Sequence, residues 1–178
     1  MDGRVRRGRV SPRPRRIAPL IALLCAAVWV ALAGTAQATD WKQGKLGHLS
    51  AHIGTYNYDA ILGDPAVRSA LQDLAGPDVE TIVINLAVAS SVACIDGFLI
   101  LRCNAPHQGG LEEAFVMIKV FDGQVRAALL HDSRMTLFAA DTEYEYVPRE
   151  LRDFVQPRTD FTRPVPPPGL VWVGKPAN

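Results

Sequence analysis

The chain has 178 residues, of which 48% are hydrophobic and 21% are charged. This length and composition predict one globular domain with an ample core, and no second domain. Seven of the 19 basic residues but only one of the 18 acidic residues precede residue 39, so the remaining chain carries 12 basic and 17 acidic groups, a net charge of −5. Such a chain argues against a nucleic-acid partner, because phosphate binding needs clustered Lys and Arg.

Residues 1–38 have the pattern of an export signal. Seven arginines precede an unbroken apolar run over residues 20–33, and the run ends at Gly34. Ala36 and Ala38 then place small residues at the −3 and −1 positions of a signal-peptidase site. We predict cleavage after Ala38, with the mature protein outside the cytoplasm.

Three other uses of the apolar run fit the sequence less well. Its 14 residues are fewer than the roughly 20 that a helix needs to span about 30 Å of hydrocarbon. A lipoprotein would place a Cys directly after the run, whereas Cys25 lies inside it. The pair Arg15-Arg16 resembles a twin-arginine signal, but Pro19 follows soon after, so ordinary export of the unfolded chain is favoured. We therefore expect no stable membrane anchor after processing.

The next segment, residues 39–59, is polar and rich in Gly. His48 and His52 are four residues apart, a spacing that would place two metal ligands on one helix face. No acidic or Cys ligand accompanies them, and glycines at 47 and 54 interrupt the segment. We predict no metal site and no cofactor.

The clearest helix is predicted for residues 65–75. Asp64 can cap its free amides, Pro65 suits its first position, and Gly76 ends it. Residues 78–85 follow, and their β-branched run suits a second short helix and a strand equally well.

The pattern then becomes that of strands, with a hairpin over residues 88–103 around the turn Asp96-Gly97. In a two-residue register Cys103 faces Ser90, which sets its sulfur on the order of 13 Å along the strand from that of Cys94. A disulfide needs Cα atoms within about 7 Å. We therefore predict two unpaired, buried thiols.

Three more strands are predicted at residues 114–121, 125–131 and 135–139, joined by tight Asp-Gly and Asp-Ser turns. A short helix at residues 149–155 closes the domain. Consecutive strands joined by tight turns form an antiparallel meander, so the predicted fold is α+β, an antiparallel sheet of about five strands with helices packed on it.

The predicted organisation is a signal peptide at residues 1–38, a single α+β domain at residues 39–156 and a Pro-rich tail at residues 157–178. The prolines of the tail favour an extended segment that lacks a core of its own.

One connection, between the second and third predicted strands, is out of place in a meander otherwise joined by short turns. Pro106 fixes one φ angle there, and two glycines permit sharp bends. We predict a loop that holds His107 out from the sheet, since projecting loops on rigid scaffolds often carry function. The alternative is that His107 is a solvated loop residue without a role. The candidate partner-binding residues are Asn104, Ala105, Pro106, His107, Gln108, Gly109 and Gly110.

A Gly-Thr-Tyr element at residues 54–56, a helix, a hairpin, the Pro106-His107 loop and further strands follow one another over about residues 53–155. This order resembles the family of the inhibitor of vertebrate lysozyme, which are bacterial periplasmic proteins. In that family the loop projects from a central sheet into the lysozyme cleft, where its His lies between the two catalytic carboxylates. The resemblance implies a periplasmic protein whose partner is lysozyme or a related glycosidase, with His107 as the plug residue and Pro106 as its rigid support.

The implied chemistry is coherent with the enzyme's mechanism. A retaining glycosidase needs one protonated carboxylic acid and one ionised carboxylate facing the bond to be cut. An imidazole hydrogen-bonded to both would fill the substrate's position and, when protonated, would favour the wrong charge state of the acid. A net charge of −5 would also steer the protein towards cationic lysozymes.

The sequence departs from the family at the two ends of the loop. Family members with established inhibition carry cysteines on both sides of Pro-His, which close the loop by a disulfide, whereas Asn104 and Gly109 stand at those positions here. Preorganisation of the loop must then come from Asn104, Pro106 and local hydrogen bonds.

The prediction is a periplasmic, non-enzymatic inhibitor of c-type lysozyme. The alternative is a non-catalytic envelope binding module of the same fold, directed at an endogenous lytic enzyme or a peptidoglycan fragment. The chain contains no nucleophile elbow, phosphate loop or Cys-His signature, and Glu112 and Glu113 beside the loop would point to opposite faces of a strand. A homodimer is compatible with the sequence.

Overall fold

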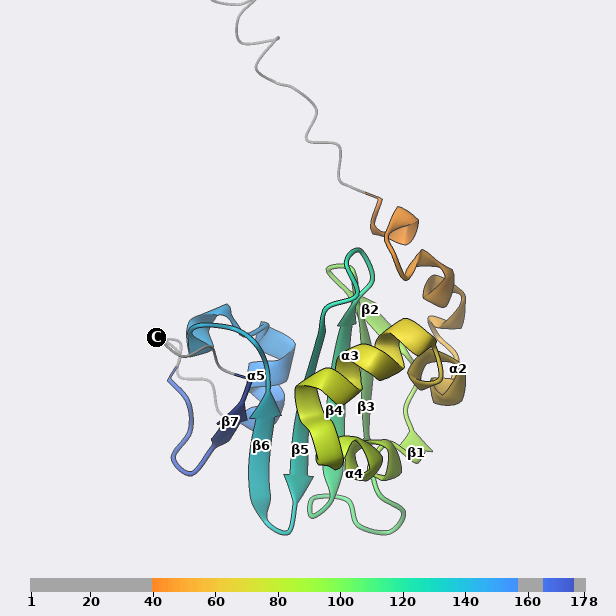
Figure 1. Ribbon diagram of the computed structural model, residues 1–178. Coiled ribbons are helices and arrows are strands. Elements are labelled where there is room, and N and C mark those ends of the chain that lie inside the picture. Colours follow the sequence, from red (N-terminus) through yellow and green to blue (C-terminus); the bar gives the residue numbers. More distant parts are fainter. Residues whose placement is uncertain (1–39, 157–164, 175–178) are drawn as a thin grey trace, which may run out of the picture. The chain divides into compact units, whose positions relative to one another are not determined.

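The computed structural model describes residues 40–156 and 165–174 (Figure 1). The predicted signal peptide and its cleavage site lie outside these residues. Within them, no helix has both the length and the apolar character that a membrane span requires. The helices are η1 Trp41–Gln43, η2 Gly47–His52, α2 Tyr58–Leu62, α3 Pro65–Ala75, η3 Gly76–Asp78, α4 Val79–Ile84, η4 Tyr144–Tyr146 and α5 Arg149–Val155, and the strands are β1 Val88–Ala89, β2 Ala93–Ile95, β3 Phe98–Asn104, β4 Glu113–Lys119, β5 Val125–His131, β6 Arg134–Phe138 and β7 Val171–Val173.

The strands form one mixed sheet in the order β1-β3-β4-β5-β6-β7, with β2 also paired to β3. Every pairing is antiparallel except β6 with β7, which is parallel. The predicted α+β class and antiparallel meander are confirmed. The sheet has seven strands rather than about five, because the first predicted strand is split in two and the Pro-rich tail contributes another.

The split of the first strand shifts its register by one residue. Cys94 lies opposite Leu99, as the hairpin predicts, but Cys103 lies opposite Ala89 and not Ser90. The cause is Val92, whose backbone exchanges two 2.8 Å hydrogen bonds with the segment at residues 54–55 and so leaves the ladder to β3. Both thiols are free, as predicted, although they are half-buried and not fully buried.

The strand β7 comes from the tail that was predicted to be extended and to lack a core. Residues 171–173 are extended, and they pair with β6 at the edge of the sheet. Trp172 fastens them, because its indole N–H donates a 2.8 Å hydrogen bond to the Ala139 carbonyl and its ring lies edge-on to Tyr144.

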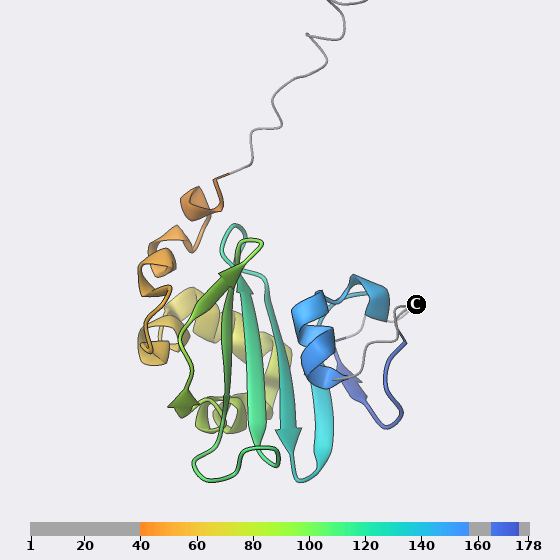
Figure 2. The ribbon, with the colours of Figure 1, turned by 180° about the vertical axis from the view of Figure 1, so that it is seen from behind.

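Helices cover both faces of the sheet (Figures 1 and 2). On one face α3 and α4 bury Leu71 and Ile82 against the strands, and on the other α5 buries Phe154, whose ring centroid is 5.3 Å from that of Phe115. The segment at residues 78–85, which suited helix or strand, is helical, and α5 spans the residues predicted for it. The two cores leave the ends of the sheet, where the loops lie, free for function.

The N-terminus of α3 is capped by Asp64, whose Oδ1 accepts hydrogen bonds from the amides of Ala66 and Val67 at 2.9 and 3.2 Å. Its Oδ2 lies 2.8 Å from Nε2 of His48, one of the two histidines whose spacing suggested metal ligands. Burial acts to raise the pKa of Asp64, but these hydrogen bonds outweigh it and the pKa is lowered. The stabilisation is therefore present above about pH 4 and is lost as the pH falls through the folded-state value.

We expect Asp64→Ala to lower the free energy of unfolding by about 1 kcal/mol at pH 7, because two amides of α3 lose their acceptor. The difference from the wild type should shrink as the pH falls below about 4, because the unfolded chain then binds a proton at Asp64 that the folded chain takes up only at a lower pH. Urea denaturation at pH 7 and pH 3 measures both values, and an equal loss at the two pH values would contradict the assignment.

Candidate functional site

The loop of interest, residues 105–112, joins β3 to β4 at one end of the sheet (Figure 1). Asn104 is the last residue of β3, and Ala105 is 5% exposed, so the loop begins with an anchored side chain. Residues 106–111 are all exposed. The predicted loop therefore exists, and it presents its apex to solvent.

The apex of the loop is a tight turn that carries His107. The Gln108 amide donates a 3.1 Å hydrogen bond to the Ala105 carbonyl and closes a four-residue turn. Pro106 takes the second position and His107 the third, where φ is +62°. Proline followed by a positive φ is the pattern of a type II turn, whose third residue is usually Gly or Asn. A His in this conformation is strained, and such strain is concentrated at functional sites.

Backbone hydrogen bonds order the rest of the loop. The Gln108 carbonyl accepts from the amides of Leu111 and Glu112, both at 3.0 Å, and the Ala105 amide donates to the Glu112 carbonyl at 2.9 Å. The Glu113 carboxylate accepts from the Gly110 amide at 2.8 Å. The loop thus contains local hydrogen bonds of the kind that its preorganisation was predicted to need.

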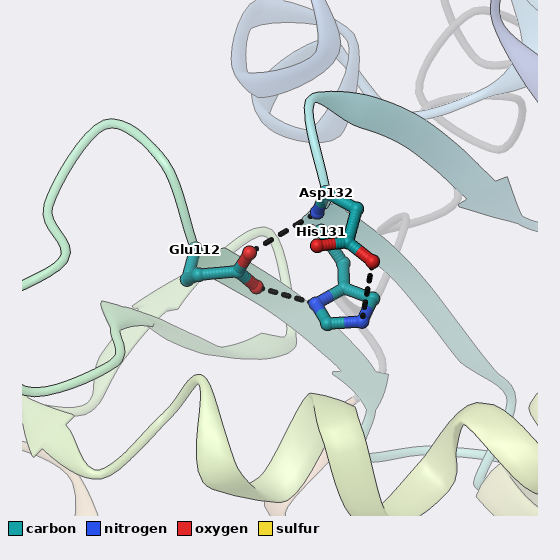
Figure 3. Close-up of side chains that lie close together, drawn as sticks. All are labelled: Glu112, His131 and Asp132. Atoms are coloured by element: carbon teal, nitrogen blue, oxygen red, sulfur yellow. Dashed lines mark hydrogen bonds and ion pairs between the residues drawn. The ribbon is translucent and has the colours of Figure 1, made fainter.

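At its C-terminal base the loop is held by the side chain of Glu112 (Figure 3). Glu112 Oε2 accepts from His131 Nδ1 at 2.6 Å and from Asn85 Nδ2 at 3.2 Å, while Oε1 accepts from the Asp132 amide at 3.1 Å. Asn85 is 2% exposed and also donates to the Leu130 carbonyl at 3.3 Å. The loop is therefore tied both to the end of α4 and to the β5–β6 turn.

The pair of Glu112 and His131 is electrostatically matched. The hydrogen bond from His131 lowers the pKa of Glu112, with help from the Asp132 amide, and the bond to Glu112 raises the pKa of His131. Each group thus favours the charged form of the other.

Glu112, His131 and Asp132 could also supply ligand atoms to one metal ion, because those atoms lie within 4.8 Å of one another. Two ligands of a tetrahedral ion at about 2.0–2.1 Å stand about 3.3 Å apart. The separation of 2.6 Å between Glu112 and His131 is instead that of a hydrogen bond. The arrangement is that of a structural network, and no motif or spacing in the sequence marks His131 or Asn85 as part of the site.

A model of the protein family described as inhibitor of vertebrate lysozyme (Ivy) matches residues 66–159, just over half of the chain. The chain belongs to this family. The match includes the whole loop, its Glu112 base and the strands that carry it. No curated protein and no solved structure matches the chain significantly.

The Ivy loop cysteines correspond, by the resemblance, to Asn104 and Gly109, and these two residues lie close to one another. A Cβ atom on Gly109 would lie 3.6 Å from Nδ2 and 3.7 Å from Cγ of Asn104. Asn104 Nδ2 also donates to the Ala105 carbonyl at 2.8 Å. Two residues without a covalent bond thus face one another where the resemblance implies a disulfide.

We expect the double substitution of Asn104→Cys and Gly109→Cys to form a disulfide, because a Cβ on Gly109 would lie 3.7 Å from Asn104 Cγ, the atom whose place the Cys sulfur at position 104 would take, and Gly109 has no positive φ. In a background with Cys94 and Cys103 changed to Ser, mass spectrometry after thiol alkylation should show no free thiol. Affinity for the partner should rise several-fold, since less loop entropy is lost on binding. A variant that stays reduced under oxidising conditions would show that residues 104 and 109 are not close.

The surface around the loop is partly apolar and partly polar. Leu111 is 63% exposed on the loop, and Ile84 at the end of α4 is 60% exposed. A pocket of about 330 Å³ opens where β1 meets the strands that flank the loop. It is lined by Val88, Ala89, Ser90, Arg102, Cys103, Asn104 and Glu113.

Proposed function

We propose that the mature protein is a periplasmic inhibitor of c-type lysozyme that inserts its His107 loop into the enzyme's cleft. Membership of the Ivy family supports inhibition of lysozyme in general. The observation that carries the loop-insertion mechanism is the exposed His107, held at a φ of +62° at the apex of a hydrogen-bonded turn. A backbone fixed in this way needs little ordering on binding.

In this mechanism His107 lies between the two catalytic carboxylates of the glycosidase. Its imidazole has one nitrogen for each carboxylate, and it excludes the sugar that would otherwise be bound there. Within the described residues, no side chain forms a hydrogen bond with His107, so its two nitrogens remain available for a partner. Pro106 limits the motion of the turn because its φ angle is fixed.

The protein acts by binding and not by chemistry of its own. Leu111, which is exposed on the loop, gives a partner apolar area to bury, which a protein–protein contact needs at its centre. The net charge of −5 after residue 38 favours encounter with a cationic enzyme.

The test is a lytic assay with the purified mature protein, residues 39–178, added to a c-type lysozyme at low and moderate salt. We expect inhibition when the protein is present in micromolar or smaller excess over the lysozyme. No inhibition at either salt concentration would overturn the proposal. Capture of an endogenous lytic enzyme from envelope extract, without inhibition of lysozyme, would point to the same fold serving another target.

A further inference from the structure

The loop that carries His107 is joined through one side chain to three residues in two other parts of the chain. Glu112 bonds to His131 at the end of β5 and to the amide of Asp132 in the β5–β6 turn (Figure 3). It also bonds to Asn85, which directly follows α4. The Glu112 side chain is 14% exposed although it lies at the base of an exposed loop. A loop residue that served only to keep the protein soluble would not need these contacts.

The backbone of Glu112 connects this network to the turn of His107. Its amide donates to the carbonyl of Gln108, and its carbonyl accepts from the amide of Ala105. Ala105 and Gln108 are the first and last residues of the turn. Both ends of the turn are therefore hydrogen-bonded to the one residue that the network holds.

We propose that Glu112, clamped by His131 and Asn85, is the positioning residue of His107 and takes the place of the loop disulfide in this chain. The clamp fixes the turn through the two cross-loop backbone bonds, so it sets the direction in which His107 leaves the sheet. This inference rests on the proposed function for its effect on inhibition, but its effect on the loop itself is independent of any partner.

The clamp depends on pH because both of its charged groups titrate. His131 faces Glu112 from the loop, Asp132 from its own turn and Arg134 from β6; the first two raise its pKa and Arg134 opposes them. Glu112 is faced by His131, by the Asp132 amide and by the neutral side chain of Asn85. The stabilisation of the loop by the clamp is full at pH values between the ordinary pKa values of Glu and His, about 4.3 and 6.5. It is lost as the pH rises through the raised value of His131, and as it falls through the lowered value of Glu112.

Amide hydrogen exchange of the isolated mature protein tests the clamp without a partner. In Glu112→Gln and in His131→Gln, the amides of Ala105 and Glu112 should exchange roughly tenfold faster than in the wild type at pH 6, after correction for intrinsic rates. His48→Gln is the matched control, because it removes a second His–carboxylate pair, of 2.8 Å, in η2. That control should leave the loop unchanged. Urea denaturation verifies that each variant is folded.

The pH dependence of loop exchange distinguishes positioning of His107 by the clamp from a general contribution of Glu112 to stability. Wild-type loop protection should fall above the pKa of His131, and His131→Gln should abolish this dependence. Unchanged exchange in Glu112→Gln, or a pH profile that survives in His131→Gln, would overturn the clamp. If exchange behaves as expected while the wild type does not inhibit lysozyme, the clamp stands and the proposed function fails. If the wild type inhibits lysozyme, and Glu112→Gln inhibits as strongly as the wild type at both pH 6 and pH 8, Glu112 does not position His107.

Discussion

His107→Asn is expected to raise the inhibition constant for c-type lysozyme by at least roughly 30-fold, a loss of about 2 kcal/mol that is typical of a central interface residue. Asn is the informative replacement because it tolerates the positive φ of this position. The turn should therefore persist while the imidazole is lost. A lytic assay over a range of inhibitor concentrations gives the constant.

His48→Asn is the control for this substitution, since His48 is an exposed histidine in η2, outside the loop. Its inhibition constant should equal that of the wild type. Circular dichroism and urea denaturation should be unchanged for His107→Asn, because residue 107 makes no buried contact. A His107→Asn protein that inhibits as strongly as the wild type would remove His107 from the mechanism.

The largest effect on stability is expected at the buried ion pair of Arg126 and Asp141. The two side chains are each 9% exposed and form two hydrogen bonds, of 2.7 and 2.8 Å. The third guanidinium nitrogen, Nη1, is buried without a hydrogen-bond partner among the described residues. Asp141→Asn would leave the charge of Arg126 buried and uncompensated, so the free energy of unfolding should fall by about 3–5 kcal/mol.

Urea denaturation at pH 7 measures this loss, and an exposed pair provides the contrast. Arg149 and Asp153 are four residues apart in α5, and the Arg149 side chain is 73% exposed. Arg149→Gln should therefore cost less than about 0.5 kcal/mol. A loss below about 1 kcal/mol for Asp141→Asn would mean that the pair is solvated in solution.

Local signals in the sequence were sufficient for the elements that have them. Asp64, Pro65 and Gly76 define α3 because capping and helix termination depend on neighbouring residues alone. The Asp96-Gly97 turn fixes the pairing of β2 with β3 for the same reason. The projecting Pro106-His107 turn was predicted because proline and glycine act through their own φ angles.

The features that could not be predicted depend on contacts between segments that are distant in the sequence. A two-residue turn at Asp122-Gly123 would pair Glu113 with Asp132, but Lys119 and Gln124 close a longer turn, and Glu113 pairs with Leu130 instead. That register brings His131 beside Glu112, so the clamp could not be predicted from the sequence pattern. The strand β7 was missed for a similar reason, since its partner in the sheet lies more than 30 residues earlier.

Insertion of the loop into the catalytic cleft is tested most directly by competition. Binding of the mature protein to c-type lysozyme is measured by isothermal titration calorimetry with and without an N-acetylglucosamine oligosaccharide that fills the cleft. We expect the apparent Kd to rise in proportion to the oligosaccharide concentration once that concentration exceeds the ligand's own Kd. An apparent Kd that is the same with an occupied cleft would contradict insertion of His107 and would place the contact elsewhere on the enzyme.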